Sequence, residues 1–365
     1  MEVGPPRRAL RRSLFAWGGC HRNQLRVFTR CLDRHPNEHL QPWDLVGNTP
    51  LLRIASLSKA TGNDIVAKAE FMNPGGSIKD RAAKGMIRAA EKTGELKPGA
   101  TIVEGTAGNT GIGLGLLGIE RGYKVVVTMP DNQAAEKYEL LSAMGVDVRK
   151  VPVVPFANPN HFFHAAKTLA DAHGWFWANQ FENPANGDFH AETTGAEIWE
   201  QCDGKVDVLV SAVGTGGTLG GVSRYLKAKN PKLRVVLVDP AGSGLSSYVQ
   251  TGKVEGSGSS ITEGIGIMRV TENFRRAIVD EAMRVSDQEM IEMLYHLARN
   301  DSLVVGTSAA LNVRGAYEIA KQHPGQNLRV VTLLCDHGSR YFSKIFNPAF
   351  LESKQLVVRP LPGLV

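Results

Sequence analysis

The sequence predicts an α/β fold in which parallel sheets carry helices on both faces. Apolar runs rich in Val and Ile alternate with helical patterns beyond residue 42, and small-residue loops join strand ends to helix starts. The length of 365 residues is sufficient for two such domains. The expected strands are 65–71, 100–104, 124–129, 146–153, 175–180, 206–213, 233–239 and 328–335. The expected helices are 82–90, 112–120, 134–144, 162–173, 195–201, 220–228, 287–298 and 309–322.

The basic charge of the protein is concentrated at its N-terminus. Residues 1–42 contain eight Arg, no Lys and three acidic residues, which gives +5 of the total net charge of +6. The rest of the chain is close to neutral, so the charge gives no argument for nucleic-acid binding. An Arg-rich, acid-poor segment interrupted by apolar residues is typical of a mitochondrial presequence, with a disordered basic tail on a cytoplasmic protein as the alternative. No stretch is apolar enough to form a transmembrane span.

The cysteines and histidines give no sign of a metal site or a disulfide framework. The four widely spaced cysteines are Cys20, Cys31, Cys202 and Cys335. This usage fits a reducing compartment. His161 and His164 are interpreted as surface side chains, and the contiguous side chains of 335–337 are expected to alternate instead of converging. The Gly- and Ser-rich stretch 241–264 is expected to be a long surface or active-site loop.

The first candidate site is a lysine in a turn between a strand and a helix. Residues 74–76 form a Pro-Gly-Gly turn after the strand 65–71, and Ser77 with Asp80 three residues later resembles a capping box. Lys79 is thereby placed in the first turn of a helix, where the positive end of the helix dipole favours the neutral amine. A neutral lysine amine can form a Schiff base; a solvated lysine in a capped turn is the alternative.

Two further loops have the composition of anion sites. In residues 105–111, small residues expose backbone N–H groups at a helix start and Asn109 adds a side-chain donor, with a tight turn as the alternative. Residues 214–218 form a phosphate cradle by composition, and the next strand ends in Asp239, as in a dinucleotide site. Leu219 stands where the third glycine of that motif belongs, so a monophosphate is favoured over a nicotinamide cofactor.

A fourth loop, residues 305–310, also lies at a helix start. Its Ser308 serves either as an N-cap or as a hydroxyl offered to a ring nitrogen, and the spacing fits both. A reactive lysine, a monophosphate cradle and a carboxylate-binding loop together indicate pyridoxal phosphate and an amino-acid substrate.

Six motifs occur in the order and composition of one known family. They are residues 47–51 (GNTPL), 73–81 (NPGGSIKDR), 108–111 (GNTG), 180–186 (QFENPAN), 214–218 (GTGGT) and 306–308 (GTS). With these motifs the chain resembles the cysteine synthases (O-acetylserine sulfhydrylases), in the tryptophan-synthase-β-like class, fold type II, of pyridoxal phosphate enzymes. The resemblance covers about residues 43–346.

This resemblance implies a role for each motif. Lys79 is expected to be the Schiff-base lysine, Asn109 to contact the 3-oxygen of the cofactor, and Ser308 to hydrogen-bond its pyridine nitrogen. The residues expected to hold the phosphate are Gly214, Thr215, Gly216, Gly217 and Thr218. Those expected to bind the substrate carboxylate are Thr106, Ala107, Gly108, Asn109 and Thr110, with Gln180 assisting.

The resemblance also implies two doubly wound α/β domains with the cofactor in the cleft between them. The smaller domain is expected at 73–184 and the larger one at 43–72 with 185–350. A presequence (1–42) and a tail (351–365) flank them. Family members are usually homodimers, so a homodimer is expected.

The implied activity is replacement of the acetoxy group of O-acetylserine by sulfide, which gives L-cysteine and acetate. The family's usual Thr-Ser-Gly-Asn-Thr has Ala107 in place of its serine, so serine and phosphoserine stay open as donors. The alternatives are a cystathionine β-synthase-like replacement on serine, and a catalytically weak homologue that acts through a partner protein.

Overall fold

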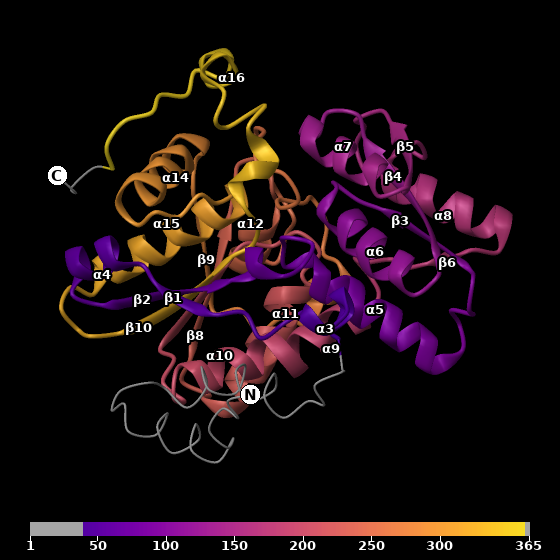
Figure 1. The fold of residues 1–365 in the computed structure, drawn as a ribbon. Coiled ribbons are helices and arrows are strands. Elements are labelled where there is room, and N and C mark those ends of the chain that lie inside the picture. Colours follow the sequence, from indigo (N-terminus) through magenta and orange to yellow (C-terminus); the bar gives the residue numbers. More distant parts are fainter. Residues whose placement is uncertain (1–38, 362–365) are drawn as a thin grey trace, which may run out of the picture. The chain divides into compact units, whose positions relative to one another are not determined.

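The computed structural model describes residues 39–361. Within them lie two sheets flanked by helices, which confirms the expected α/β fold (Figure 1). The larger sheet has the order β1-β2-β10-β7-β8-β9, and its strand pairs are parallel except β1–β2. The smaller sheet has the order β5-β4-β3-β6 and is parallel throughout. The strands are β1 (Leu51–Arg53), β2 (Asp64–Ala69), β3 (Thr101–Gly105), β4 (Lys124–Pro130), β5 (Asp147–Val151), β6 (Phe176–Trp177), β7 (Val208–Ser211), β8 (Arg234–Asp239), β9 (Glu281–Arg284) and β10 (Arg329–Leu334).

The helices connect the strands and cover the sheets. They are α3 (Pro42–Leu45), α4 (Ala55–Thr61), α5 (Lys79–Thr93), α6 (Asn109–Glu120), α7 (Ala135–Ala143), α8 (Phe162–His173), α9 (Pro184–His190), α10 (Ala196–Gln201), α11 (Gly217–Lys229), α12 (Leu245–Thr251), α13 (Glu272–Arg275), α14 (Asp287–Asn300), α15 (Thr307–Gln322) and α16 (Pro348–Ser353). Three short segments have other helical geometries: the 3₁₀ turns η1 (Glu70–Met72) and η3 (Gly338–Tyr341), and the π turn η2 (Ala191–Gly195).

Both faces of each sheet are buried. Val330 of β10 packs into one core with α14 and α15, whereas its neighbour Val331 packs into a second core with α11. In the smaller sheet Ile102 packs toward α5 and α6, and Val103 packs toward α8. Because successive strand side chains point to opposite faces, burial on both faces requires the continuous apolar runs seen in the sequence. This is the doubly wound arrangement that the resemblance implied.

The expected strands are confirmed, with changes at their ends. Residues 70–72 form η1 instead of continuing β2, and β6 is only two residues long. The sequence did not indicate β1 or β9, because three or four partly exposed residues carry no apolar run. The stretch 241–264 is not an uninterrupted loop, since it contains α12.

The strands of the smaller sheet lie between residues 101 and 177, inside the range expected for the smaller domain, and the domain boundaries stay a prediction. Within the expected tail, Leu351 and Leu361 pack into the core beside α14 and α15. Nearly all of the expected presequence lies outside the described residues. Among residues 39–361, no helix is both long and apolar enough to cross a membrane.

Candidate active site

A cavity of about 420 Å³ lies at the carboxyl ends of strands from both sheets. Its walls include Thr106 after β3, Ser211 at the end of β7 and Cys335 after β10. Parts of the segments 155–163 and 262–269 complete the lining. In open α/β sheets, ligands bind outside the carboxyl ends of the strands. The cavity is therefore the candidate active site.

Lys79 lines this cavity as the first residue of α5. Burial lowers the pKa of its amine below the ordinary value, and Lys137 adds to the lowering, while Cys335 and Asp336 oppose it. The pKa thus moves in the expected direction, but burial is the main cause instead of the helix terminus. A lowered pKa enlarges the neutral fraction of the amine, which is the form that attacks a carbonyl carbon.

The capping box expected from Ser77 and Asp80 is wrong. Ile78 is the N-cap of α5, and no side chain caps this helix. The Asp80 carboxylate instead accepts a hydrogen bond from Gly75 N at 2.5 Å, and burial raises its pKa to about 7. Asp80 therefore holds the turn that leads into Lys79, which is a different local role from capping.

Four of the five residues of the predicted substrate loop, 106–110, line the cavity. Thr106, Ala107, Asn109 and Thr110 line it, whereas Gly108 does not. Gly108 is the N-cap of α6 with a φ of +122°, a conformation that favours glycine. The N–H groups in the first turn of α6 have no intrahelical partner and lie at the positive end of the helix, so an anion is stabilised there.

Gln180 supports this loop. Thr110 Oγ1 donates to Gln180 Oε1 at 2.5 Å, and Gln180 Nε2 donates to Gly105 O at 2.9 Å. The backbone N–H of Gln180 donates to Glu104 at 3.2 Å, and burial raises the pKa of that carboxyl to about 8. Gln180 also lines the cavity. The structure therefore brings it together with the predicted substrate loop, with its side-chain amide already engaged.

Asn109 connects the substrate loop with two other segments. Its Nδ2 donates to Asp336 Oδ2 at 2.7 Å, and its Oδ1 accepts a hydrogen bond from Arg340 Nη1 at 2.6 Å. Arg340 also donates to Gly75 O in the lysine turn, and Tyr341 OH donates to Asp336 Oδ2. Sequence reasoning missed Asp336 and Arg340. The available signal was a carboxylate two residues after a buried parallel strand, because such strand ends are where α/β folds place polar groups near a ligand.

The glycine-rich loop lies at the start of α11. Gly214, Thr215, Gly216 and Thr218 line the cavity, whereas Gly217 packs against Asn186 instead. Gly216 has a φ of +87°, so this position suits glycine. The first N–H groups of α11 lack intrahelical partners and sit at the positive end of a 13-residue helix. N–H groups arranged in this way can stabilise an anion, so the loop keeps the geometry expected of a phosphate cradle.

Ser308 also lines the cavity and is only 5% exposed. The N-cap alternative is wrong, because Gly306 is the N-cap of α15. Ser308 lies beside Cys335, whose pKa is raised to about 11, chiefly by burial. The thiol is therefore uncharged near neutral pH, and the serine hydroxyl, which hydrogen-bonds Cys335, is a neutral donor or acceptor.

Aromatic side chains form a further wall that the sequence did not indicate. Phe156, Phe163 and Phe181 line the cavity, and the Arg269 guanidinium lies 4.4, 4.9 and 5.0 Å from their ring centroids. The surface assignment of His161 is wrong, because it lines the cavity, and burial lowers its pKa to about 4. Within residues 39–361, no group of three or more His, Cys, Asp and Glu side chains is arranged to hold a metal ion.

Comparison with known proteins identifies the family. Residues 42–336 match the family described as pyridoxal-phosphate dependent enzyme. This chain belongs to that family. Cysteine synthase 1 of Emericella nidulans is 48% identical to this chain, and the matched region covers 86% of each of the two chains. The putative mitochondrial cysteine synthase of Saccharomyces cerevisiae is 41% identical over 88% of this chain and 86% of its own. A crystal structure of an O-acetylserine dependent cystathionine beta-synthase from Helicobacter pylori has a TM-score of 0.77 at 31% identity, covering 84% of this chain and 98% of that one.

The residues of the cavity fit pyridoxal phosphate, the cofactor of this family. The amine of Lys79 suits its aldehyde, the N–H groups at the start of α11 suit its phosphate, and Ser308 offers a partner for a ring nitrogen. These groups line one cavity. A carbon added at Gly214 would run into Gly264 O, so two backbone segments that both line the cavity pack closely here. Glycine therefore lets the loop present its N–H groups to the cavity without a side chain.

Proposed function

We propose that this enzyme is a pyridoxal phosphate-dependent cysteine synthase, which replaces the acetoxy group of O-acetylserine by sulfide and yields L-cysteine and acetate. The observation that carries the proposal is that Lys79, with a lowered pKa, shares one cavity with the glycine-rich loop and Ser308. The curated relatives named cysteine synthase, at 41–48% identity, support the same reaction.

Each predicted residue has a task in this reaction. Bound pyridoxal phosphate supplies an electron sink that makes the α-proton of the amino acid acidic and lets a β-substituent leave. Lys79 holds the cofactor at its Nζ, and the freed amine takes the α-proton of the substrate. The N–H groups of 214–218 hold the phosphate, and those of 106–110 bind the substrate carboxylate. Ser308 meets the ring nitrogen with a neutral hydroxyl, which leaves the ring a weaker electron sink than a carboxylate would.

The cations in the cavity wall favour a donor with a neutral leaving group. Apart from Lys79, two Lys or Arg side chains among the described residues line the cavity, and both are paired. Lys137 Nζ lies 2.5 Å from Glu263 Oε2, and Arg269 pairs with Glu182. A phosphoserine dianion would compete with Glu182 and Glu263 for these cations, although Glu263 is shared with Lys344 at 2.5 Å. O-acetylserine makes no such demand.

A cystathionine β-synthase-like reaction stays the alternative, since the Helicobacter pylori structure carries that description together with dependence on O-acetylserine. A catalytically weak homologue is disfavoured because Lys79 and the phosphate loop are both present.

Assays of the purified holoenzyme test the proposal. Cysteine formation from O-acetylserine and sulfide is to be measured beside phosphoserine with sulfide and serine with homocysteine. We expect the first pair to give the highest kcat/KM. A higher value for serine with homocysteine would replace the proposal by the cystathionine reaction, and no turnover with any pair would favour the weak homologue.

We further infer that the enzyme is mitochondrial and a homodimer. The basic charge of 1–42 and the name of the Saccharomyces cerevisiae relative support the location. A fusion of residues 1–42 to a fluorescent reporter is expected to co-localise with mitochondria. A matched fusion with the eight arginines changed to glutamine is expected to stay diffuse, and diffuse fluorescence of the unchanged fusion would reject the location.

A further inference from the structure

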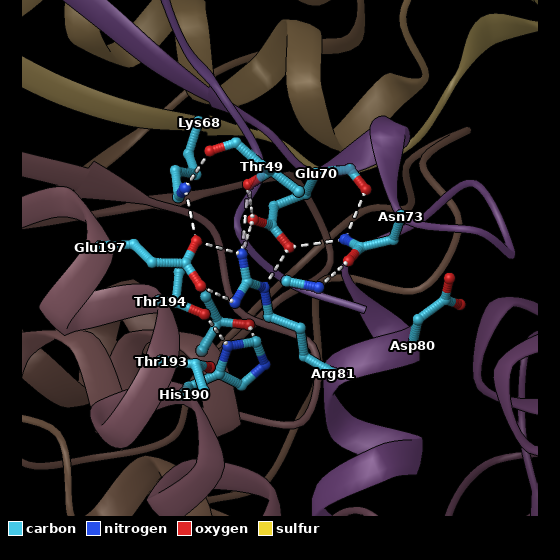
Figure 2. Close-up of polar contacts among 12 residues, drawn as sticks. Thr49, Lys68, Glu70, Asn73, Asp80, Arg81, His190, Thr193, Thr194 and Glu197 are labelled. Carbon is cyan, nitrogen blue, oxygen red and sulfur yellow. Dashed lines mark hydrogen bonds and ion pairs between the residues drawn. The ribbon is translucent and has the colours of Figure 1, made fainter. Parts of the chain in front are cut away.

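A network of buried charges surrounds Arg81, two residues after Lys79 (Figure 2). Arg81 Nε and Nη2 donate to the two carboxylate oxygens of Glu70 at 2.7 and 2.8 Å. Arg81 Nη1 and Nη2 donate to those of Glu197 at 2.8 and 2.7 Å. The planar guanidinium is thus held by two carboxylates, each in a bidentate pair, which fixes its orientation as well as its position.

Residues 47–49, which we call the strap, also hydrogen-bond to this network. Thr49 Oγ1 donates to Glu70 Oε1 at 2.7 Å and accepts a hydrogen bond from Arg81 Nη2 at 3.2 Å. The backbone N–H of Asn48 donates to Glu197 Oε1 at 3.0 Å. Lys68 Nζ lies 2.6 Å from Glu197 Oε2 and also donates to Thr49 O. Three segments distant in sequence therefore meet at Arg81.

The charges of this network balance, and nearly all of it is inaccessible to water. The side chains of Lys68, Glu70 and Arg81 are 0% exposed, and that of Glu197 is 15% exposed. Burial by itself raises the pKa of Glu70 and of Glu197, but Arg81 and Lys68 together outweigh it, so that the pKa of Glu197 is about 2. Removing four charges from water is costly, and packed apolar side chains often give equal stability. Positioning is the stronger reason for such an arrangement.

The network lies on the opposite side of α5 from the cavity. Lys79 and Arg81 are the first and third residues of this helix, so their side chains point about 200° apart around its axis. Lys79 and Thr106 line the cavity, whereas Arg81 and its partners do not. Rotation of α5 about its axis would move both side chains together. Fixing the guanidinium therefore fixes the direction of the lysine amine.

We propose that Arg81 is a positioning residue, which with Glu70, Glu197 and the strap sets the rotation of the first turn of α5 and so aims Lys79 at the cofactor aldehyde. This inference rests on the proposed function, because it assumes that Lys79 holds the cofactor. Arg81 does not contact the cavity, so its effect is on covalent capture and not on the binding of the phosphate.

Capture and simple binding can be measured separately on the full-length protein stripped of its cofactor. Capture forms a C=N bond between Lys79 Nζ and the aldehyde carbon and releases the aldehyde oxygen as water; its rate is read from the rise of visible absorption. Pyridoxamine 5′-phosphate has no aldehyde, so its dissociation constant reports binding alone. We expect Arg81→Lys, which keeps the charge but loses the bidentate pairs, to slow capture about tenfold or more. Its pyridoxamine phosphate affinity should stay within about twofold of the wild type.

Thr49 supplies a milder variant in case Arg81→Lys does not fold. Thr49→Val is expected to slow capture, but by a smaller factor than Arg81→Lys does. Thr49→Ser keeps the hydroxyl and is expected to capture the cofactor at the wild-type rate. Arg88→Lys is the control, because Arg88 lies on the same helix in an exposed pair with Glu192. Unchanged capture in Arg81→Lys and Thr49→Val would overturn the inference. The inference would also be overturned if the affinity for pyridoxamine phosphate fell by the same factor as the capture rate, because that result would indicate general disruption of the site. If Lys79→Ala still captures the cofactor, the proposed function itself is wrong.

Discussion

Lys79→Ala is expected to abolish the visible absorption of the bound cofactor and to remove turnover. Alanine has no amine to join the aldehyde or to take the α-proton of the substrate. Loss of a positioned proton acceptor alone lowers rates by about 10²–10⁴-fold, and loss of the covalent attachment adds to this. Absorbance spectra of the purified protein and initial rates of cysteine formation are the measurements.

Lys92→Ala is a matched control for this change, because Lys92 lies on the exposed side of the same helix. It is expected to leave the spectrum and the rate unchanged. Retention of both the visible band and turnover in Lys79→Ala would mean that another amine holds the cofactor. Lys137 would then be the residue to replace next, since it also lines the cavity.

Gly216→Ala is expected to weaken cofactor binding strongly. Gly216 has a φ of +87°, and an added Cβ would lie 2.6 Å from the Cα of Phe274, which is backbone and cannot turn away. The loop must shift, and the N–H groups at the start of α11 then lose their alignment with the phosphate. One lost hydrogen bond to a charged acceptor is worth about 1.5–3 kcal/mol, which corresponds to about 10- to 100-fold in the dissociation constant. The dissociation constant is measured by titrating the cofactor-free protein with pyridoxal phosphate.

The control for Gly216→Ala is Gly94→Ala at the end of α5. Gly94 has a similar φ of +76°, but a Cβ there would meet nothing within 4 Å. Both variants are expected to lose stability from the strained backbone, on the order of 1 kcal/mol, and only Gly216→Ala is expected to lose cofactor affinity. Equal affinities in the two variants would show that the loop does not hold the phosphate.

The parts of the site that the sequence predicted are those encoded by short local patterns. The glycine-rich loop around Gly216 and the turn before Lys79 each follow a buried strand and begin a helix, so their place at the carboxyl edge follows from the chain order alone. The family expected from the six motifs is confirmed by the match over residues 42–336. The roles of individual residues stay predictions.

The parts that the sequence did not predict depend on contacts between distant segments. Arg81 and Glu197 are 116 residues apart, and Asn109 and Asp336 are 227 apart, so no local pattern relates them. The surface interpretation of His161 is wrong because the start of its helix faces the cavity, and no local pattern indicates this. The wrong capping box at Ser77 has a local cause instead, because the Asp80 carboxylate accepts a hydrogen bond from Gly75 N in the turn before it.

The pairing of β2 with β10 bears on the order in which the molecule assembles. Arg329 at the start of β10 is paired with Asp64 at the start of β2, although 265 residues separate them. During synthesis, the edge of β2 that pairs with β10 therefore stays unpaired until almost the whole described chain has emerged. The turn that carries Lys79 follows β2 after only the short η1, so the lysine is set in place late in folding. A nascent chain thus exposes an unpaired strand edge, and chaperone binding in this interval would protect it from aggregation.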